Sequence, residues 1–94
     1  MVSIIIPYKN AEQFINESID SIINQSYKNW ELILVNDNSI DNSSLIAQKY
    51  STNDFRIKHF NSDGNGIIDA LSKGYENSNG KYIARMDADD IMNV

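Results

Sequence analysis

The sequence predicts an α/β fold: a Rossmann-like open parallel sheet flanked by helices, built in the order βαβαβαβ. Four short apolar runs alternate with three segments of helical periodicity, and three of the runs are almost continuously apolar. Such runs are typical of strands covered on both faces of a parallel sheet. Right-handed crossovers place helices on the faces of that sheet. One reversal after the third strand gives the expected strand order 3-2-1-4.

The four predicted strands differ in polarity. They span residues 2–6, 32–35, 56–60 and 81–86. The third run contains Arg56, Lys58 and His59, so we expect it near an edge of the sheet, and we expect the other three to be covered.

Helical periodicity marks the segments between the strands. Ile15, Ile19 and Ile22 recur at the spacing of one helix face. Asn10, with Gln13 three residues later, resembles a capping box ahead of that helix.

Two further helices follow the same logic. Their apolar positions are Leu45, Ile46 and Tyr50 for the second helix, and Ile67, Ile68, Leu71 and Tyr75 for the third. We expect Asp41 to cap the second helix and Asn79-Gly80 to stop the third.

Length, composition and charge exclude several classes of protein. The 94 residues suffice for one domain, 1–94, and 41% hydrophobic residues argue against a disordered chain. The net charge of -5 argues against binding to nucleic acid, which needs basic patches. No cysteine is present, which excludes disulfides and thiolate zinc sites. The apolar runs are too short for a transmembrane helix.

Polar and turn-forming residues follow all four predicted strands. They are Pro7-Tyr8, then residues 36–39, 62–66 and 87–90. Ligands of open α/β sheets bind outside the carboxyl ends of the strands, so we expect a site on this rim.

The run Asp87-Ala88-Asp89-Asp90 carries the strongest chemical signal. Carboxylates held this close repel one another, and a divalent cation such as Mg²⁺ or Mn²⁺ offsets that repulsion. The alternative is a solvated helix cap. With Asp37 able to accept hydrogen bonds from a base or a ribose, the rim suits a metal-bound nucleoside diphosphate.

Other kinds of site have less support. No Gly-x-Gly-x-x-Gly follows the first strand and no Walker-type loop is present, which argues against dinucleotide and P-loop proteins. The lone His59 lies within a strand, where we expect it to be structural or on the surface. We expect Trp30 and the five tyrosines to be core and packing residues, with Tyr8 the exception because it lies on the rim.

Four segments in order resemble family 2 glycosyltransferases of the GT-A fold. They are residues 3–10 (SIIIPYKN), 31–39 (ELILVNDNS), 66–74 (GIIDALSKG) and 80–90 (GKYIARMDADD). The resemblance implies transfer of a sugar from a nucleotide-diphosphate sugar, most often a UDP-sugar, to a hydroxyl acceptor such as a glycan or lipid-linked sugar. It also implies inversion and a divalent metal, Mn²⁺ or Mg²⁺.

The resemblance also implies roles for individual residues. Pro7 and Tyr8 would line the nucleobase pocket, Asp37 would bind the base or ribose, and Asp69 would belong to the donor site. Asp87 would face the ribose or sugar, while Asp89 and Asp90 would hold the metal. Residues 36–39 read Asn-Asp-Asn-Ser where many members have Asp-Asp-Gly-Ser, which leaves base preference open.

No residue here matches the family's catalytic base, so we expect a donor-binding part, truncated from a longer enzyme and inactive alone. In a truncated part, the sheet would not continue past the fourth strand, so we expect apolar surface to be exposed there and self-association at that edge. The implied setting is bacterial polysaccharide biosynthesis, in the cytoplasm or at the inner face of the cell membrane. The alternatives are a nucleotidyltransferase, which should carry a basic glycine-rich loop after the first strand, a phosphoacceptor signalling domain, and a non-catalytic nucleotide-binding or interaction module.

Overall fold

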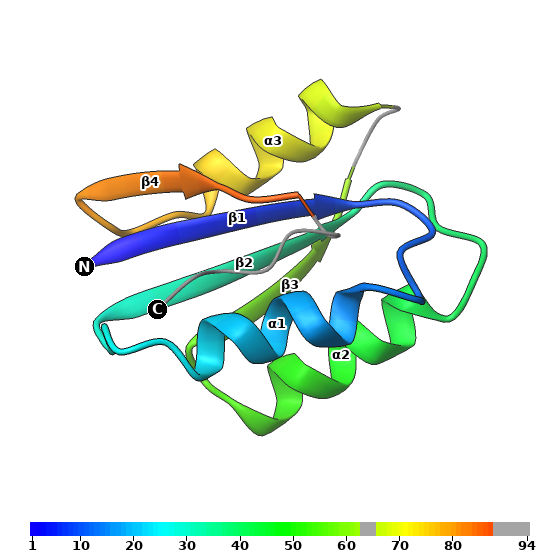
Figure 1. Ribbon diagram of the computed structural model, residues 1–94. Helices are drawn as coiled ribbons and strands as arrows, with labels where there is room; N and C mark the ends of the chain where they lie inside the picture. The colour runs from blue at the N-terminus through cyan, green and yellow to red at the C-terminus, as the bar shows by residue number, and fades with distance from the viewer. Residues whose placement is uncertain (63–65, 88–94) are drawn as a thin grey trace.

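The structure, a computed structural model, describes residues 1–62 and 66–87 (Figure 1). Strands and helices alternate as predicted. The strands are β1 (Val2–Tyr8), β2 (Trp30–Asn36), β3 (Ile57–Asn61) and β4 (Tyr82–Arg85). The helices are α1 (Ile15–Ile23), α2 (Ser43–Asn53) and α3 (Ile67–Glu76).

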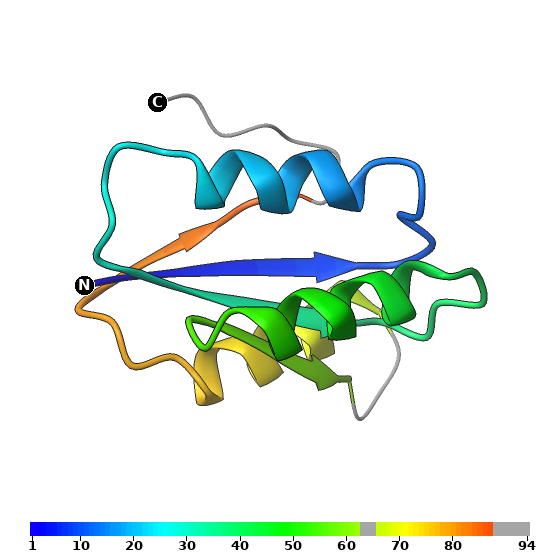
Figure 2. The same cartoon turned by 90° about the horizontal axis from the view of Figure 1, so that it is seen from below.

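The four strands form one parallel sheet in the order β3-β2-β1-β4, which confirms the predicted order. Val2 of β1 pairs with Trp30 of β2 on one side and with Tyr82 of β4 on the other. These three residues lie side by side at the amino ends of their strands. Because the strands are parallel, their carboxyl ends lie along the opposite rim of the sheet (Figure 2).

Helices cover both faces of the sheet. α1 and α2 lie on one face and α3 lies on the other (Figure 1). Successive side chains of a strand point to opposite faces, so Ile4 and Ile6 pack with α1 and α2, whereas Ile5 packs with Ala70 of α3. β1 is therefore buried on both sides, as its apolar sequence predicts.

The prediction that the fourth strand is covered is wrong. Tyr82 is 63% exposed and Ile83 is 46% exposed. β4 pairs with β1 alone in the sheet order, and α3 lies against β1, β2 and β3. An apolar run thus occupies an open edge of the sheet.

The predicted capping box at Asn10 and Gln13 is also wrong. α1 begins at Ile15, with Phe14 in the N-cap position and no side-chain cap. Asn10 instead has φ 51°, the left-handed region that asparagine tolerates better than most residues. The Asn10 side chain therefore accepts a hydrogen bond from the loop at Ile40 and does not cap α1.

At the second helix, the N-cap position is Asn42 and not the predicted Asp41. The Asp41 carboxylate nevertheless accepts hydrogen bonds from the N–H and the hydroxyl of Ser43 in the first turn of α2. α3 ends at Glu76, a few residues before Asn79-Gly80.

The aromatic residues divide between core and surface. Tyr8 and Trp30 are buried, while Tyr27, Tyr75 and Tyr82 are each about half exposed or more. For these three tyrosines the expectation of a core position is wrong. In the described residues, no helix combines the length and the apolar character that a membrane span requires.

Candidate functional site

The rim at the carboxyl ends of the strands is held together by backbone hydrogen bonds. The N–H of Asp37 donates to the carbonyl of Tyr8 at 2.8 Å, and the N–H of Ser62 donates to the carbonyl of Asn36 at 2.9 Å. The segments that leave β1, β2 and β3 are therefore fixed to one another where the site was predicted.

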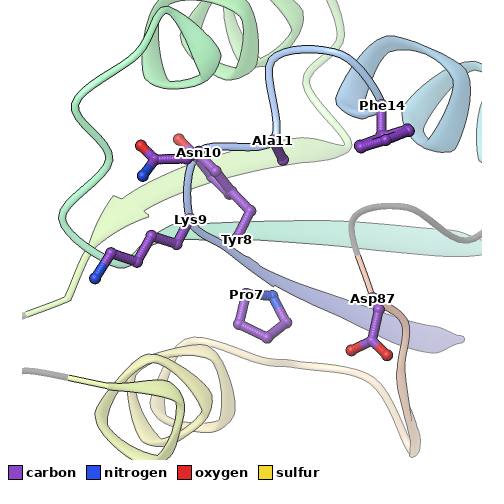
Figure 3. Close-up of a pocket in the computed structure, with 7 residues that line it drawn as sticks. All are labelled: Pro7, Tyr8, Lys9, Asn10, Ala11, Phe14 and Asp87. Carbon is purple, nitrogen blue, oxygen red and sulfur yellow. The ribbon is translucent and has the colours of Figure 1, made fainter.

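A pocket of about 300 Å³ opens beside the end of β1 (Figure 3). Its lining residues are Pro7, Tyr8, Lys9, Asn10, Ala11, Phe14 and Asp87. A smaller pocket of about 70 Å³ shares Pro7, Tyr8 and Lys9 and adds Asp37 and Ile67. Asp37 follows β2 and Asp87 follows β4, so these two acids lie on either side of the central strand β1.

Asp37 is the more buried of the two acids, at 8% exposed. Its Oδ1 accepts a hydrogen bond from the N–H of Gly66 at 3.1 Å. Gly66 occupies the N-cap position of α3 with φ 95°, a backbone conformation that favours glycine. The Asp37 side chain thus connects the end of β2 to the start of α3.

Asp87 is exposed at the mouth of the larger pocket. Its Oδ1 lies 3.3 Å from the guanidinium of Arg85. Lys9 lines both pockets, so a cationic side chain and two carboxylates share this end of the sheet. Carboxylate oxygens suit a hard divalent cation, and a lysine beside them suits phosphate oxygens.

One wall of the larger pocket is the loop after β1, and hydrogen bonds to the loop after β2 hold it in place. The N–H of Asn10 donates to Oγ of Ser39 at 3.0 Å, and the N–H of Ile40 donates back to Oδ1 of Asn10 at 2.8 Å. The loop after β1 and the loop after β2 are therefore joined in both directions through Asn10.

A second reciprocal pair extends this junction. The N–H of Glu12 donates to Oδ2 of Asp41 at 3.2 Å, and the N–H of Asn42 donates to Oε1 of Glu12 at 3.1 Å. Hydrogen bonds from Ser43 hold the pKa of Asp41 below its usual range, so this carboxylate is an ionised acceptor at neutral pH.

Below these loops, Tyr8 is only 3% exposed. Its hydroxyl lies 2.7 Å from Nε2 of His59 on β3. Burial raises the pKa of Tyr8 well above its usual value, and the nearby side chain of Ser44 opposes part of this shift. Burial lowers the pKa of His59, so its imidazole is neutral at pH 7.

The structure therefore brings together four of the predicted site residues: Pro7, Tyr8, Asp37 and Asp87. Asp69 lies in the first turn of α3, is exposed, and lines neither of these two pockets. The predicted metal residues Asp89 and Asp90 lie outside the described residues. Within residues 1–62 and 66–87, no three His, Asp or Glu side chains are grouped so that they could hold a metal ion.

Four pocket residues were not predicted as site residues from the sequence: Lys9, Asn10, Ala11 and Phe14. All four lie in the segment after the first predicted strand, and that position was the available signal. Asn10 was noticed, but as a helix cap.

Comparison with protein families gives one match that covers almost the whole chain. Residues 3–94 match the family described as "Glycosyl transferase family 2". The chain is also 49% identical, over 92 residues, to an uncharacterized glycosyltransferase of Haemophilus influenzae. That alignment covers 97% of this chain but only 28% of the relative, so the chain spans little more than a quarter of that protein's length.

Solved structures show the same fold. The crystal structure of residues 1–349 of S. aureus TarS superposes with a TM-score of 0.89 at 27% identity, covering 98% of this chain and 28% of that one. TarS 1–349 in complex with UDP-GlcNAc gives 0.79 at 28% identity, covering 98% of this chain and 27% of that one. The mannosyltransferase PcManGT of Pyrobaculum calidifontis, in complex with GDP-Man and Mn²⁺, gives 0.88 at 21% identity, covering 99% and 28%; this likeness concerns the fold alone.

Proposed function

This chain belongs to glycosyl transferase family 2, and from that premise we propose that it is the donor-binding part of a longer, inverting and metal-dependent glycosyltransferase. The reaction would transfer a sugar from a nucleotide-diphosphate sugar to a hydroxyl acceptor. The observation that carries the proposal is the pair of acids, Asp37 and Asp87, on either side of the end of β1 beside the pockets.

The nucleoside would bind on the Asp37 side of the rim. A buried carboxylate held by the N–H of Gly66 is positioned to accept further hydrogen bonds from a base N–H or a ribose hydroxyl. Pro7 and Tyr8 would shape the floor of the base pocket, and Asp69 would contact the donor from α3. The complexes of TarS with UDP and UDP-GlcNAc support a UDP-sugar as the donor.

The diphosphate would lie on the Asp87 side, with a divalent metal. Asp87 fits this role because it is an exposed carboxylate at the pocket mouth, and hard cations prefer oxygen ligands. Asp89 and Asp90 would complete the metal site, with Mn²⁺ or Mg²⁺ as the ion. When bound, the metal would neutralise charge that develops on the departing diphosphate. Lys9 lines both pockets and its side chain extends away from Asp87 (Figure 3), so it would add a cation on the Asp37 side of the rim.

The acceptor side of the reaction needs more than these residues. An inverting transfer requires a base that deprotonates the attacking hydroxyl, and the family resemblance assigns that role to none of them. We therefore expect the 94 residues to bind donor without turnover. The acceptor would be a glycan or lipid-linked sugar in bacterial polysaccharide synthesis, in the cytoplasm or at the inner face of the membrane.

Titration calorimetry with UDP and GDP, with and without Mn²⁺, tests the donor site. We expect metal-dependent binding that weakens about tenfold or more in Asp37→Asn, because a hydrogen bond to a charged group contributes about 1.5–3 kcal/mol. Asp89→Asn should abolish the effect of the metal. Asp54→Asn is the matched control, because Asp54 pairs with Arg56 and precedes β3 rather than following a strand at the rim.

Two results would contradict this proposal. One is nucleotide binding that neither requires metal nor changes in Asp37→Asn. The other is equal weakening in Asp37→Asn and Asp54→Asn, which would indicate a general loss of folding rather than a lost ligand.

A further inference from the structure

The side chain of Tyr8 reaches across the sheet to a histidine. Tyr8 is the last residue of β1, and its register partner on β2 is Asn36, which in turn pairs with Asn61 of β3. His59 lies two residues before Asn61, so it points to the same face as Tyr8. The Tyr8 hydroxyl lies 2.7 Å from Nε2 of His59, with 6.1 Å between ring centroids.

Packing holds the Tyr8 ring as well as this hydroxyl contact. The ring is buried in the core cluster with Ile6 and Ile15, and the side chain of Ser44, in the first turn of α2, lies near enough to lower the pKa of the Tyr8 hydroxyl. The phenol is thus held on β3 through its hydroxyl and in the core through its ring. Because leaving a buried hydroxyl without a partner is costly, the ring has one favourable position.

This position matters because Tyr8 lines both rim pockets and sits between Pro7 and Lys9, which also line them. A shift of the Tyr8 ring would move the backbone of its neighbours. It would also move the carbonyl of Tyr8, which accepts the N–H of Asp37.

We propose that His59 is a positioning residue of the donor site: its contact with the Tyr8 hydroxyl holds the end of β1, and with it Pro7, Lys9 and Asp37, in the arrangement that receives the nucleotide. This inference rests on the donor-binding function proposed above. His59 touches neither pocket itself, so it acts through Tyr8.

The contact depends on the charge of the imidazole. A neutral His59 either accepts the Tyr8 O–H at Nε2 or donates an Nε2–H to the Tyr8 oxygen, according to its tautomer. A protonated imidazole has no acceptor at Nε2. The other charged group that acts on Tyr8 is Asp41, just ahead of α2. Because burial lowers the pKa of His59, the imidazole becomes protonated only below the usual histidine pKa of about 6.5, and Nε2 can then only donate to the Tyr8 oxygen.

The test measures UDP affinity in the presence of Mn²⁺ for His59→Phe, His59→Gln and Tyr8→Phe. We expect His59→Phe and Tyr8→Phe to weaken binding about threefold to tenfold, the range set by one lost hydrogen bond. Glutamine can accept the Tyr8 O–H, so His59→Gln should recover most of the affinity. The affinity of the wild type for UDP should fall as the pH is lowered below about 6.5, where His59 becomes protonated. This fall should be absent in His59→Gln.

Tyr50→Phe is the matched control. Tyr50 also donates its hydroxyl to one distant side chain, Asp20 at 2.7 Å, but it lies between α1 and α2 and lines neither rim pocket. Its loss should leave UDP affinity unchanged. The melting temperature of each variant reports whether it is folded, and where His59→Phe is unfolded, Tyr8→Phe and the pH profile of the wild type decide.

The outcomes separate the two proposals. Wild-type protein that binds no nucleotide overturns both. Wild-type protein that binds UDP with the same affinity as His59→Phe overturns the positioning role alone. The same conclusion follows if His59→Gln is as weak as His59→Phe, or if Tyr50→Phe weakens binding equally.

Discussion

Glu31 is a buried carboxylate at the rim opposite the candidate site, and it joins three parts of the chain. It accepts hydrogen bonds from the Ser3 hydroxyl and the Asn79 N–H, each at 2.5 Å, and from the Lys58 ammonium at 2.9 Å. Burial alone would raise its pKa, but these three donors prevail and lower it to about 2. The side chain is 5% exposed, so its partners must come from the protein.

The first prediction concerns this residue. Replacing Glu31 by Gln should lower the free energy of unfolding by about 1.5–3 kcal/mol at pH 7, because three charge-assisted hydrogen bonds are weakened or lost. Glu17→Gln, at an exposed position of α1, should change it by less than about 0.5 kcal/mol. Urea unfolding followed by circular dichroism measures both.

The pH dependence of the difference in unfolding free energy between the wild type and Glu31→Gln tests the role of the Glu31 carboxylate. The folded-state pKa of Glu31 is depressed from 4.5 to about 2, so its contribution is complete above about pH 4.5 and is lost as the pH falls towards 2. The gap between wild type and Glu31→Gln should therefore narrow in acid. A gap that stays constant from pH 7 to pH 2.5 would contradict this account.

At the scale of elements, α3 depends on a close approach to β1. A Cβ added at Gly74 would lie 2.5 Å from Cγ2 of Ile5, a residue with no exposed surface. Glycine inside a helix costs about 1 kcal/mol relative to alanine, yet here it allows the helix to pack directly against the central strand. Packing, not helix propensity, decides the residue at this position.

The second prediction follows from this contact. Gly74→Ala should destabilise the protein by about 1–2 kcal/mol, because the overpacking cost of about 1–3 kcal/mol exceeds the gain in helix propensity. Ser72→Ala, at an exposed position of the same helix, should be neutral or slightly stabilising. If both alanines stabilise in thermal melts, the close contact with Ile5 has no energetic consequence.

The sequence predicted strands and helices well, because their patterns depend on residues that are close together in the chain. Short apolar runs predicted the strands, and the spacing of apolar residues predicted the three helices. The loop conformation of Asn10 was not predictable, since it depends on Ser39 and Ile40, which are some thirty residues away. His59 was missed for the same reason: its partner Tyr8 is 51 residues distant.

At the scale of the whole molecule, the sheet ends in an open strand. β4 carries Tyr82 and Ile83 exposed, and its outer backbone groups have no neighbouring strand within the described sheet. Exposed strand edges with apolar side chains pair readily with other chains. The predicted strand order already placed this strand at an edge, and the apolar run by itself predicted cover because such runs are typical of strands buried on both faces.

The third prediction is self-association through this edge. The wild-type chain should form concentration-dependent dimers in sedimentation velocity experiments, and Ile83→Lys should shift it to monomer because a charge on the edge opposes pairing. Phe55→Lys is the control: Phe55 is 91% exposed but lies at the turn between α2 and β3, away from β4. Dimers that respond to Phe55→Lys and not to Ile83→Lys would place the interface elsewhere.

The central position of β1 also sets the order in which the molecule can be assembled. β1 pairs with β4, the last strand among the described residues, and the N–H of Gly80 donates to the Ser3 hydroxyl across 77 positions of sequence. Loop closure over such a distance is slow, and a high proportion of remote contacts lowers folding rates. During synthesis, β1, β2 and β3 can pair while one edge of β1 stays open. Docking of β4 and closure of the Glu31 network then come last, so a ribosome-bound chain that lacks residues 79–87 should expose the β1 edge to chaperones.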